Sequence, residues 1–387
     1  HSLIFMFLHS LSYSRFSLHI ERDDYMNGTI THQFGRAFTG QGEKNIYNEL
    51  INEARKVYFI KSPPTFKLSD LFRQVGYHYV KRGYDIEWFY DPLHVDVIEA
   101  TYVKSNRTLF IQASHPVSFE PKYYGSTHHV ISFYEAYDEQ KLREHGGFLR
   151  EKTLHSEQWL GKALQTLTNA KNIHDEWEVP YVSGMDWTGF DAQAESLFND
   201  TFTTLKFNKP SHRTHRLMGT LTPEGPKDYF DSLTKRVKRR IFIKGYPGSG
   251  KSTLMKRFGE HAEGLGLDTQ WGWCGLDCNS IDYVWLPELQ TILFDSTSPH
   301  EYEPDRSGDE IFDVKKFRDL NEEEGLLVEG IIARYKEEIV HATEYLQVYC
   351  TDDETIRETL DTCVNNYKWQ EIEIDLFQKI DNSSIFK

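Results

Sequence analysis

The chain repeats itself at a constant spacing. Residues 31–131 align without a gap to residues 214–314, at an offset of 183 positions. The identical pairs include Thr31 and Thr214, His32 and His215, Ser69 and Ser252, Gly83 and Gly266, Trp88 and Trp271, and Gly125 and Gly308. Self-similarity over such a length is typical of a duplicated structural unit, so the sequence predicts two copies of one domain.

Each copy has the same predicted order of elements. A lead-in with a glycine and a short helix comes first, and a strand, a loop and a longer helix follow. Further strands are predicted at 84–90 and 108–112 in the first copy, and at 268–273 and 291–295 in the second. Strands that alternate with helices predict a parallel sheet covered by helices on both faces.

The most specific motif lies in the second copy, between a predicted strand at 240–244 and a predicted helix at 253–265. Its sequence, Gly245-Tyr-Pro-Gly-Ser-Gly-Lys-Ser252, fits G-x-x-x-x-G-K-[ST], the phosphate-binding loop. Glycines let backbone N–H groups converge on phosphate oxygens, Lys251 would reach the β- and γ-phosphates, and Ser252 would ligate Mg2+. The residues predicted to bind the nucleotide are Gly245, Tyr246, Pro247, Gly248, Ser249, Gly250, Lys251, Ser252 and Thr253.

An acidic strand end accompanies this loop. The apolar run Thr291-Ile-Leu-Phe-Asp295 is typical of the strand whose carboxylate holds Mg2+ in such proteins, so Ser252 and Asp295 are the predicted metal ligands. Lys251, Asp295 and His300 are the candidate catalytic residues. His300 contacts the γ-phosphate, its water or a substrate in one interpretation, and is an ordinary loop residue in the other. For Glu301 the ordinary loop interpretation is favoured.

The first copy lacks these groups. Where the second copy has its glycines and lysine, the first has Ser62, Thr65, Lys67 and Leu68. Residues with a Cβ resist the backbone angles of a phosphate nest, and leucine supplies no charge. Gln112 replaces the strand-end aspartate. We therefore predict one ATP per chain, in the C-terminal half.

These features define the predicted architecture. It is an α/β fold class with two tandem P-loop NTPase-like domains, each a parallel sheet flanked by helices and each with a helical appendage. Residues 1–30 are predicted to be a leader outside the domains, with residues 1–25 not native sequence. The degenerate domain is predicted at 31–207 and the intact one at 208–387, divided at a polar, proline-containing stretch. The appendages either pack beside the sheet or form a lid over the nucleotide.

The composition and net charge of the chain limit the kinds of molecule that it is expected to bind. The net charge of −15 disfavours a general nucleic-acid binder, and no apolar run reaches the roughly 18 residues that a membrane-spanning helix needs. The four cysteines do not form C-x-x-C pairs, so the sequence makes a zinc site improbable. We expect them to be reduced thiols in a cytoplasmic protein.

The chain resembles a bacterial family of tandem P-loop proteins described only as ATPases, over about residues 31–387. The resemblance is carried by the loop Gly245–Ser252, the run Leu276–Asp282 and the run Asp295–His300. It implies a P-loop fold, ATP as the nucleotide and a cytoplasmic location. Members of that family carry a loop in both halves, which this chain does not.

Three functions stay open at this point. The leading prediction is an Mg2+-dependent ATP-binding protein, an ATPase or ATP-driven switch with one site. A small-molecule or nucleotide kinase is the second, and a non-catalytic nucleotide-binding scaffold that binds a partner is the third.

Overall fold

The computed structural model describes residues 28–203, 205–298 and 300–383. Most of the predicted leader, residues 1–27, lies outside the described residues, as does Pro299. Ile30, at the end of the predicted leader, already belongs to the first strand.

The described elements repeat in two halves. The first half contains β1 (Ile30–Phe34), β2 (Arg36–Thr39), β3 (Gly42–Asn45), α1 (Tyr47–Glu53), β4 (Lys56–Lys61), α2 (Lys67–Val80), β5 (Ile86–Tyr90), β6 (Ile98–Val103), β7 (Thr108–Gln112) and β8 (His128–Ser132). The second contains β9 (Arg213–Leu217), β10 (Gly219–Thr222), β11 (Gly225–Asp228), α5 (Phe230–Thr234), β12 (Arg239–Lys244), α6 (Lys251–Gly264), β13 (Thr269–Trp273), β14 (Ile281–Leu286), β15 (Thr291–Asp295) and β16 (Asp309–Asp313). The equivalence predicted from the sequence repeat thus extends to element order.

The two halves form one mixed, mostly parallel sheet of 12 strands, in the order β16-β12-β15-β14-β13-β9-β1-β5-β6-β7-β4-β8. The prediction of a purely parallel sheet was wrong, because β6 and β14 each run antiparallel to both of their neighbours. Neither segment is among the strands predicted from the sequence. They are buried strands, and β6 is buried at every residue, so it lacks the alternation that reveals a strand with one exposed face.

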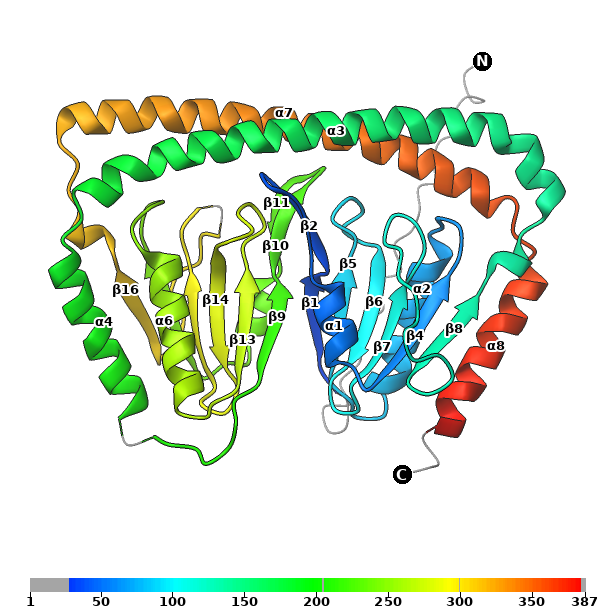
Figure 1. Cartoon of the computed structure of the whole chain (residues 1–387), viewed down its shortest axis with the longest axis horizontal. Coiled ribbons are helices and arrows are strands. Elements are labelled where there is room, and N and C mark those ends of the chain that lie inside the picture. Colours follow the sequence, from blue (N-terminus) through cyan, green and yellow to red (C-terminus); the bar gives the residue numbers. More distant parts are fainter. Residues whose placement is uncertain (1–27, 204, 299, 384–387) are drawn as a thin grey trace, which may run out of the picture.

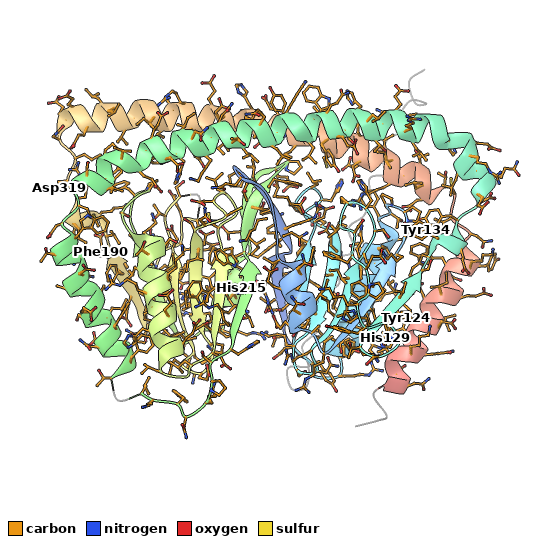
Figure 2. The ribbon with its side chains drawn as sticks, viewed as in Figure 1. Tyr124, His129, Tyr134, Phe190, His215 and Asp319 are labelled. Atoms are coloured by element: carbon orange, nitrogen blue, oxygen red, sulfur yellow. The ribbon has the colours of Figure 1, made fainter. Side chains whose placement is uncertain are left out.

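The halves meet where β1 pairs antiparallel with β9, at Phe34 and Leu217. Arg216 lies beside this seam with only 2% of its side chain exposed. Its guanidinium contacts Glu53 at 2.9 Å and Glu87 at 2.8 Å, both in the first half. The neighbouring His215 is labelled in Figure 2. This buried ion network fixes the two halves relative to each other.

Two long helices cross the whole molecule. α3 (Glu139–Ser183) follows the first half and α7 (Glu322–Asp361) follows the second, and they lie side by side along one edge of the sheet (Figure 1). Asp138 caps α3 by accepting from Gln140 N and Lys141 N, and Asn321 forms a capping box at the start of α7. Apolar side chains between them form a core, namely Ala163, Leu167, Ala342, Leu346 and Tyr349.

Because α3 and α7 each run from one half to the other, the helix that follows each of them packs on the opposite half. α4 (Trp187–Phe202) continues from α3 yet packs on the second half, where Phe190 meets Phe312 and Phe317 (Figures 1 and 2). α8 (Asn366–Ser383) continues from α7 yet packs on the first half, where Trp369 meets Phe133. Each half is therefore completed by the appendage of the other. Among the described residues, none of the helices combines the length and the apolar character that crossing a bilayer requires.

Candidate functional site

The predicted phosphate loop joins β12 to α6. Gly248 and Gly250 have φ angles of 73° and 86°, in the left-handed region that favours glycine, and α6 begins at Lys251. The Ser249 hydroxyl donates to Tyr246 O at 2.6 Å and tightens the turn. A strand, a glycine-containing loop and a helix N-terminus therefore follow one another as the motif requires.

Pairing in the sheet brings the acidic strand end to this loop. β15 is the parallel neighbour of β12, with Ile243 opposite Asp295, so both strands end at the same edge. The Lys251 ammonium lies 3.6 Å from the Asp295 carboxylate and donates to Gly245 O at 3.0 Å and Tyr246 O at 2.8 Å. Burial raises the pKa of Asp295, and the nearby Lys251 opposes that rise. A cation at this edge would stabilise the ionised carboxylate.

The other predicted metal ligand, Ser252, is held against the antiparallel strand β14. Its hydroxyl accepts from Ile281 N at 3.1 Å, which places the next residue, Asp282, on the same side of the site. Asp282 acts on both Asp295 and His300 electrostatically. Oxygen donors from Ser252 and Asp295, with the carboxylate of Asp282 nearby, suit Mg2+, which prefers oxygen ligands. The remaining loop residues differ in burial, since Ser249 is buried, Pro247 half-buried and Thr253 exposed.

His300 lies between two carboxylates. Nδ1 is 2.7 Å from Asp228 and Nε2 is 3.6 Å from Asp282. Burial lowers its pKa, but the hydrogen bond to Asp228 and the nearby Asp282 carboxylate outweigh that and raise it to about 10. At neutral pH His300 is therefore a cation, and both of its ring nitrogens face carboxylates. Its geometry suits the positioning of Asp282 better than proton transfer at a phosphate. Glu301 is exposed, as the loop interpretation predicts.

The end of α3 covers the loop. A Cβ placed on Gly248 would lie 2.7 Å from Glu178 O and 2.9 Å from Glu178 Cα, and the ring of Tyr181 stacks on Tyr246 at 4.6 Å between centroids. Burial, together with the nearby charge of Lys171, lowers the pKa of His174, one turn before Glu178, to about 4. The appendage of the first copy thus lies on the site of the second. A helix that contacts the loop is common to both alternatives for the appendage, so the lid stays a prediction.

Sequence reasoning missed several of these neighbours. Glu178, Tyr181 and Trp187 come from the first appendage, and nothing in their local pattern indicates that the chain crosses between halves. Trp187 approaches Gly250, where a Cβ would lie 3.0 Å from its ring. Asp282 was noted as polar, but its position beside Ser252 depends on the unpredicted strand β14. Arg306, in the loop before β16, donates to Thr234 O and Lys235 O.

The first half has the same framework and different chemistry. Leu68, equivalent to Lys251, is buried with 1% exposure. Thr65 donates to Asp361 on α7, where the second half has Gly248 against Glu178. Gln112 stands in place of Asp295. Comparison with protein-family models, with curated proteins and with solved structures found no match to this chain.

Proposed function

We propose that the chain binds one Mg2+-nucleoside triphosphate, most simply ATP, at the loop Gly245–Ser252 of the second half, and works as an ATPase or ATP-driven switch. One observation carries the proposal. The loop has two glycines in the left-handed backbone conformation that a phosphate nest uses, and its lysine lies 3.6 Å from the carboxylate that ends the adjacent parallel strand. Backbone N–H groups and Lys251 would hold the phosphates, and Ser252 and Asp295 would hold Mg2+, which would neutralise phosphate charge.

Two features favour a switch over rapid hydrolysis. Ser296, not a carboxylate, follows Asp295, and its hydroxyl donates to Tyr302 O at 2.6 Å, so no side-chain base is available at that position. In addition, α3 lies against Gly248, so a bound triphosphate and the helix compete for space near the loop. Because α3 also packs on α7 along its length, a displacement at Glu178 would reach the first half.

A phosphotransferase is the second candidate. It is favoured by the same helix, since an element that covers the phosphates can exclude water from a transfer reaction. Release of phosphate from Mg2+-ATP alone supports an ATPase, and transfer that needs a metabolite pool supports a kinase. Binding without turnover supports a scaffold.

Isothermal titration with a non-hydrolysable ATP analogue and Mg2+ tests the site itself. We expect one nucleotide per chain, and weaker binding when Mg2+ is omitted. Hydrogen exchange in residues 171–183 should change on binding, because this segment covers the loop. Two nucleotides per chain would contradict the assignment of the first half as degenerate. Absence of binding to the folded protein would overturn the proposed function.

A further inference from the structure

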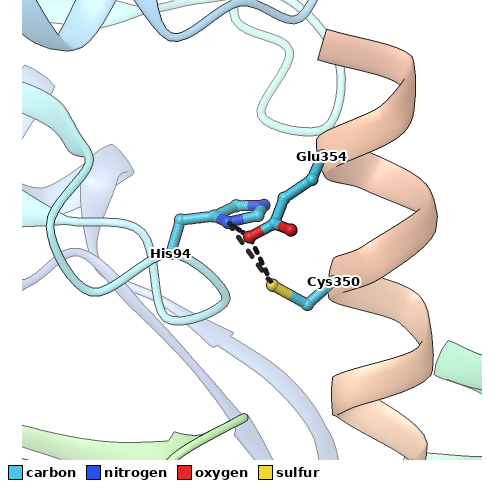
Figure 3. A group of neighbouring side chains, drawn as sticks. All are labelled: His94, Cys350 and Glu354. Carbon is cyan, nitrogen blue, oxygen red and sulfur yellow. Dashed lines mark hydrogen bonds and ion pairs between the residues drawn. The ribbon is translucent and has the colours of Figure 1, made fainter. Parts of the chain in front are cut away.

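A second cluster of ligand-type side chains lies in the first half, away from the phosphate loop. His94 follows β5 in a loop, and Cys350 and Glu354 lie one turn apart on α7 (Figure 3). His94 Nδ1 is 3.4 Å from Cys350 Sγ and 3.8 Å from Glu354 Oε1, and Cys350 Sγ is 3.7 Å from Glu354 Oε1. One nitrogen, one sulfur and one oxygen thus converge on a single point.

The imidazole of His94 is held in the orientation that a metal ligand needs. Its other nitrogen, Nε2, is 2.7 Å from the Asp353 carboxylate, and Arg357 fixes that carboxylate in turn at 2.6 Å. Metal-bound histidines characteristically donate their second N–H to a carboxylate, which sets the tautomer and aims the free lone pair. Here the lone pair of Nδ1 is aimed at Cys350 and Glu354.

The spacing of the three donors fits a small tetrahedral ion. From usual zinc–ligand bond lengths, tetrahedral donors lie about 3.4–3.6 Å apart, close to the 3.4–3.8 Å found here. Thiolate and imidazole ligands favour zinc over Mg2+ or Ca2+, which take oxygen donors. The side chain of Glu354 is 52% exposed, which gives an ion a route from solvent and leaves room for a fourth ligand.

The second half supplies a comparison at the equivalent place. Asp277 and Lys171 occupy the positions of His94 and Glu354 in the repeat, and their side chains form an ion pair of 3.6 Å. There a cationic ammonium links the long helix to the loop after the strand. In the first half the equivalent link contains an imidazole, a thiol and a carboxylate, which are side chains that a divalent cation can bind.

We propose that His94, Cys350 and Glu354 form a Zn2+ site that fastens α7 to the first half. On binding, the Cys350 thiol releases its proton to solvent, a sulfur–zinc bond forms, and the ion's two charges balance the thiolate and the Glu354 carboxylate. His94 lies 256 positions before Cys350 in the chain. The absence of paired cysteines, which made a zinc site improbable from the sequence, therefore does not bear on this site.

Metal titration of the full chain tests the proposal. The protein is stripped with a chelator and titrated with Zn2+ against a chromophoric competitor, and with Co2+ by absorption spectroscopy. We expect one tight Zn2+ per chain and a thiolate-to-cobalt charge-transfer band. Bound Zn2+ should also raise the unfolding temperature.

Three variants distinguish this site from other thiols and carboxylates. Cys350→Ser should lose the charge-transfer band and bind Zn2+ at least about 100-fold more weakly. Asp353→Asn, which removes the carboxylate that orients His94 and pairs with Arg357, should weaken binding about 10- to 100-fold. Cys278→Ser, at a half-exposed cysteine of the second half, is the matched control and should bind as the unchanged chain does.

If Cys350→Ser fails to fold, Glu354→Gln replaces it, since that side chain is half exposed and its loss should still weaken binding. The proposal is overturned if the folded protein takes up no Zn2+. It is also overturned if a folded Cys350→Ser or Glu354→Gln variant binds with unchanged affinity, or if Cys278→Ser removes the cobalt band. None of these results depends on nucleotide binding.

Discussion

The two halves share their supporting contacts almost atom for atom. Ser69 accepts from Ile98 N at 3.0 Å in the first half, and Ser252 accepts from Ile281 N at 3.1 Å in the second. Likewise, the lysines that end β4 and β12 each pair with a glutamate, at 2.6 Å for Lys61 and 2.7 Å for Lys244. We take contacts present in both halves to stabilise the shared fold, even where, as at Ser252, a motif also suggests a functional role.

The two halves use different side chains to supply the cation for an equivalent carboxylate. In the first half Arg36 contacts Glu99 at 2.7 Å. In the second, Gly219 takes the position of Arg36 and His300 serves the equivalent carboxylate, Asp282. A Cβ on Gly219 would lie 2.8 Å from the His300 ring, so the glycine is what admits the histidine.

The same arrangement of strands therefore carries different groups of charged side chains in the two halves. The first half fills its strand ends with a buried ion network in which Arg36 and Arg357 share Asp91. The second half keeps a lysine and a carboxylate at its loop, both partly accessible at 11% and 20% exposure. At its loop the second half therefore leaves charged groups that a ligand can reach, whereas the first half fills the equivalent strand ends with buried ion pairs.

The largest effect is expected from breaking the first network. Arg36→Ala leaves Glu99 and Asp91 buried with a lost partner, so the free energy of unfolding should fall by about 3–5 kcal/mol. Denaturant unfolding measures it. The control is Arg82→Ala, at a half-exposed arginine, which should stay within about 0.5 kcal/mol. A loss below about 1 kcal/mol for Arg36→Ala would show that the network does not support the first half.

The next effect concerns the lysine that only the second half retains. Lys251→Ala removes the ammonium at the loop, so affinity for the ATP analogue should fall about 100-fold while the fold persists. Lys256→Ala, on the same helix, is the matched control, since Lys256 donates to Asn279 O on the surface. Equal affinities for the two variants in calorimetry would contradict the site.

Much of this comparison was accessible from the sequence. The repeat predicted equivalent elements, and the motif predicted Lys251 beside Asp295, because both follow strands whose ends share an edge. The sequence did not predict that α3 and α7 run from one half to the other. The apolar side chains of an amphipathic helix show that one side is buried, but not which copy of the domain it packs on. The partner of His300 was also hidden, because it depends on Asp228 in β11, 72 positions away.

The pH dependence of stability should reveal the charge on His300. Its pKa in the folded chain, about 10, lies above the ordinary histidine value of 6.5. The stabilisation is therefore complete below pH 6.5 and is lost as pH rises through 10, by up to about 1.4 kcal/mol per pH unit between these limits. In His300→Gln that contribution is absent, so the two stability curves should converge toward pH 10. Parallel curves would show that His300 is neutral in the folded chain.

The smallest expected effect is the sharpest test of the comparison, because it uses one substitution in both halves. Ser69→Ala and Ser252→Ala each remove the acceptor of one buried backbone N–H, and each should cost about 1 kcal/mol of unfolding free energy. Only Ser252 directly follows a loop lysine, Lys251, whose ammonium lies 3.6 Å from the Asp295 carboxylate. Its loss should therefore also raise the Mg2+ concentration needed for half-maximal nucleotide binding, whereas Ser69→Ala should leave it unchanged. If both variants shifted the Mg2+ requirement equally, Ser252 would be only a framework residue like its counterpart. The metal would then depend on the carboxylates of Asp282 and Asp295.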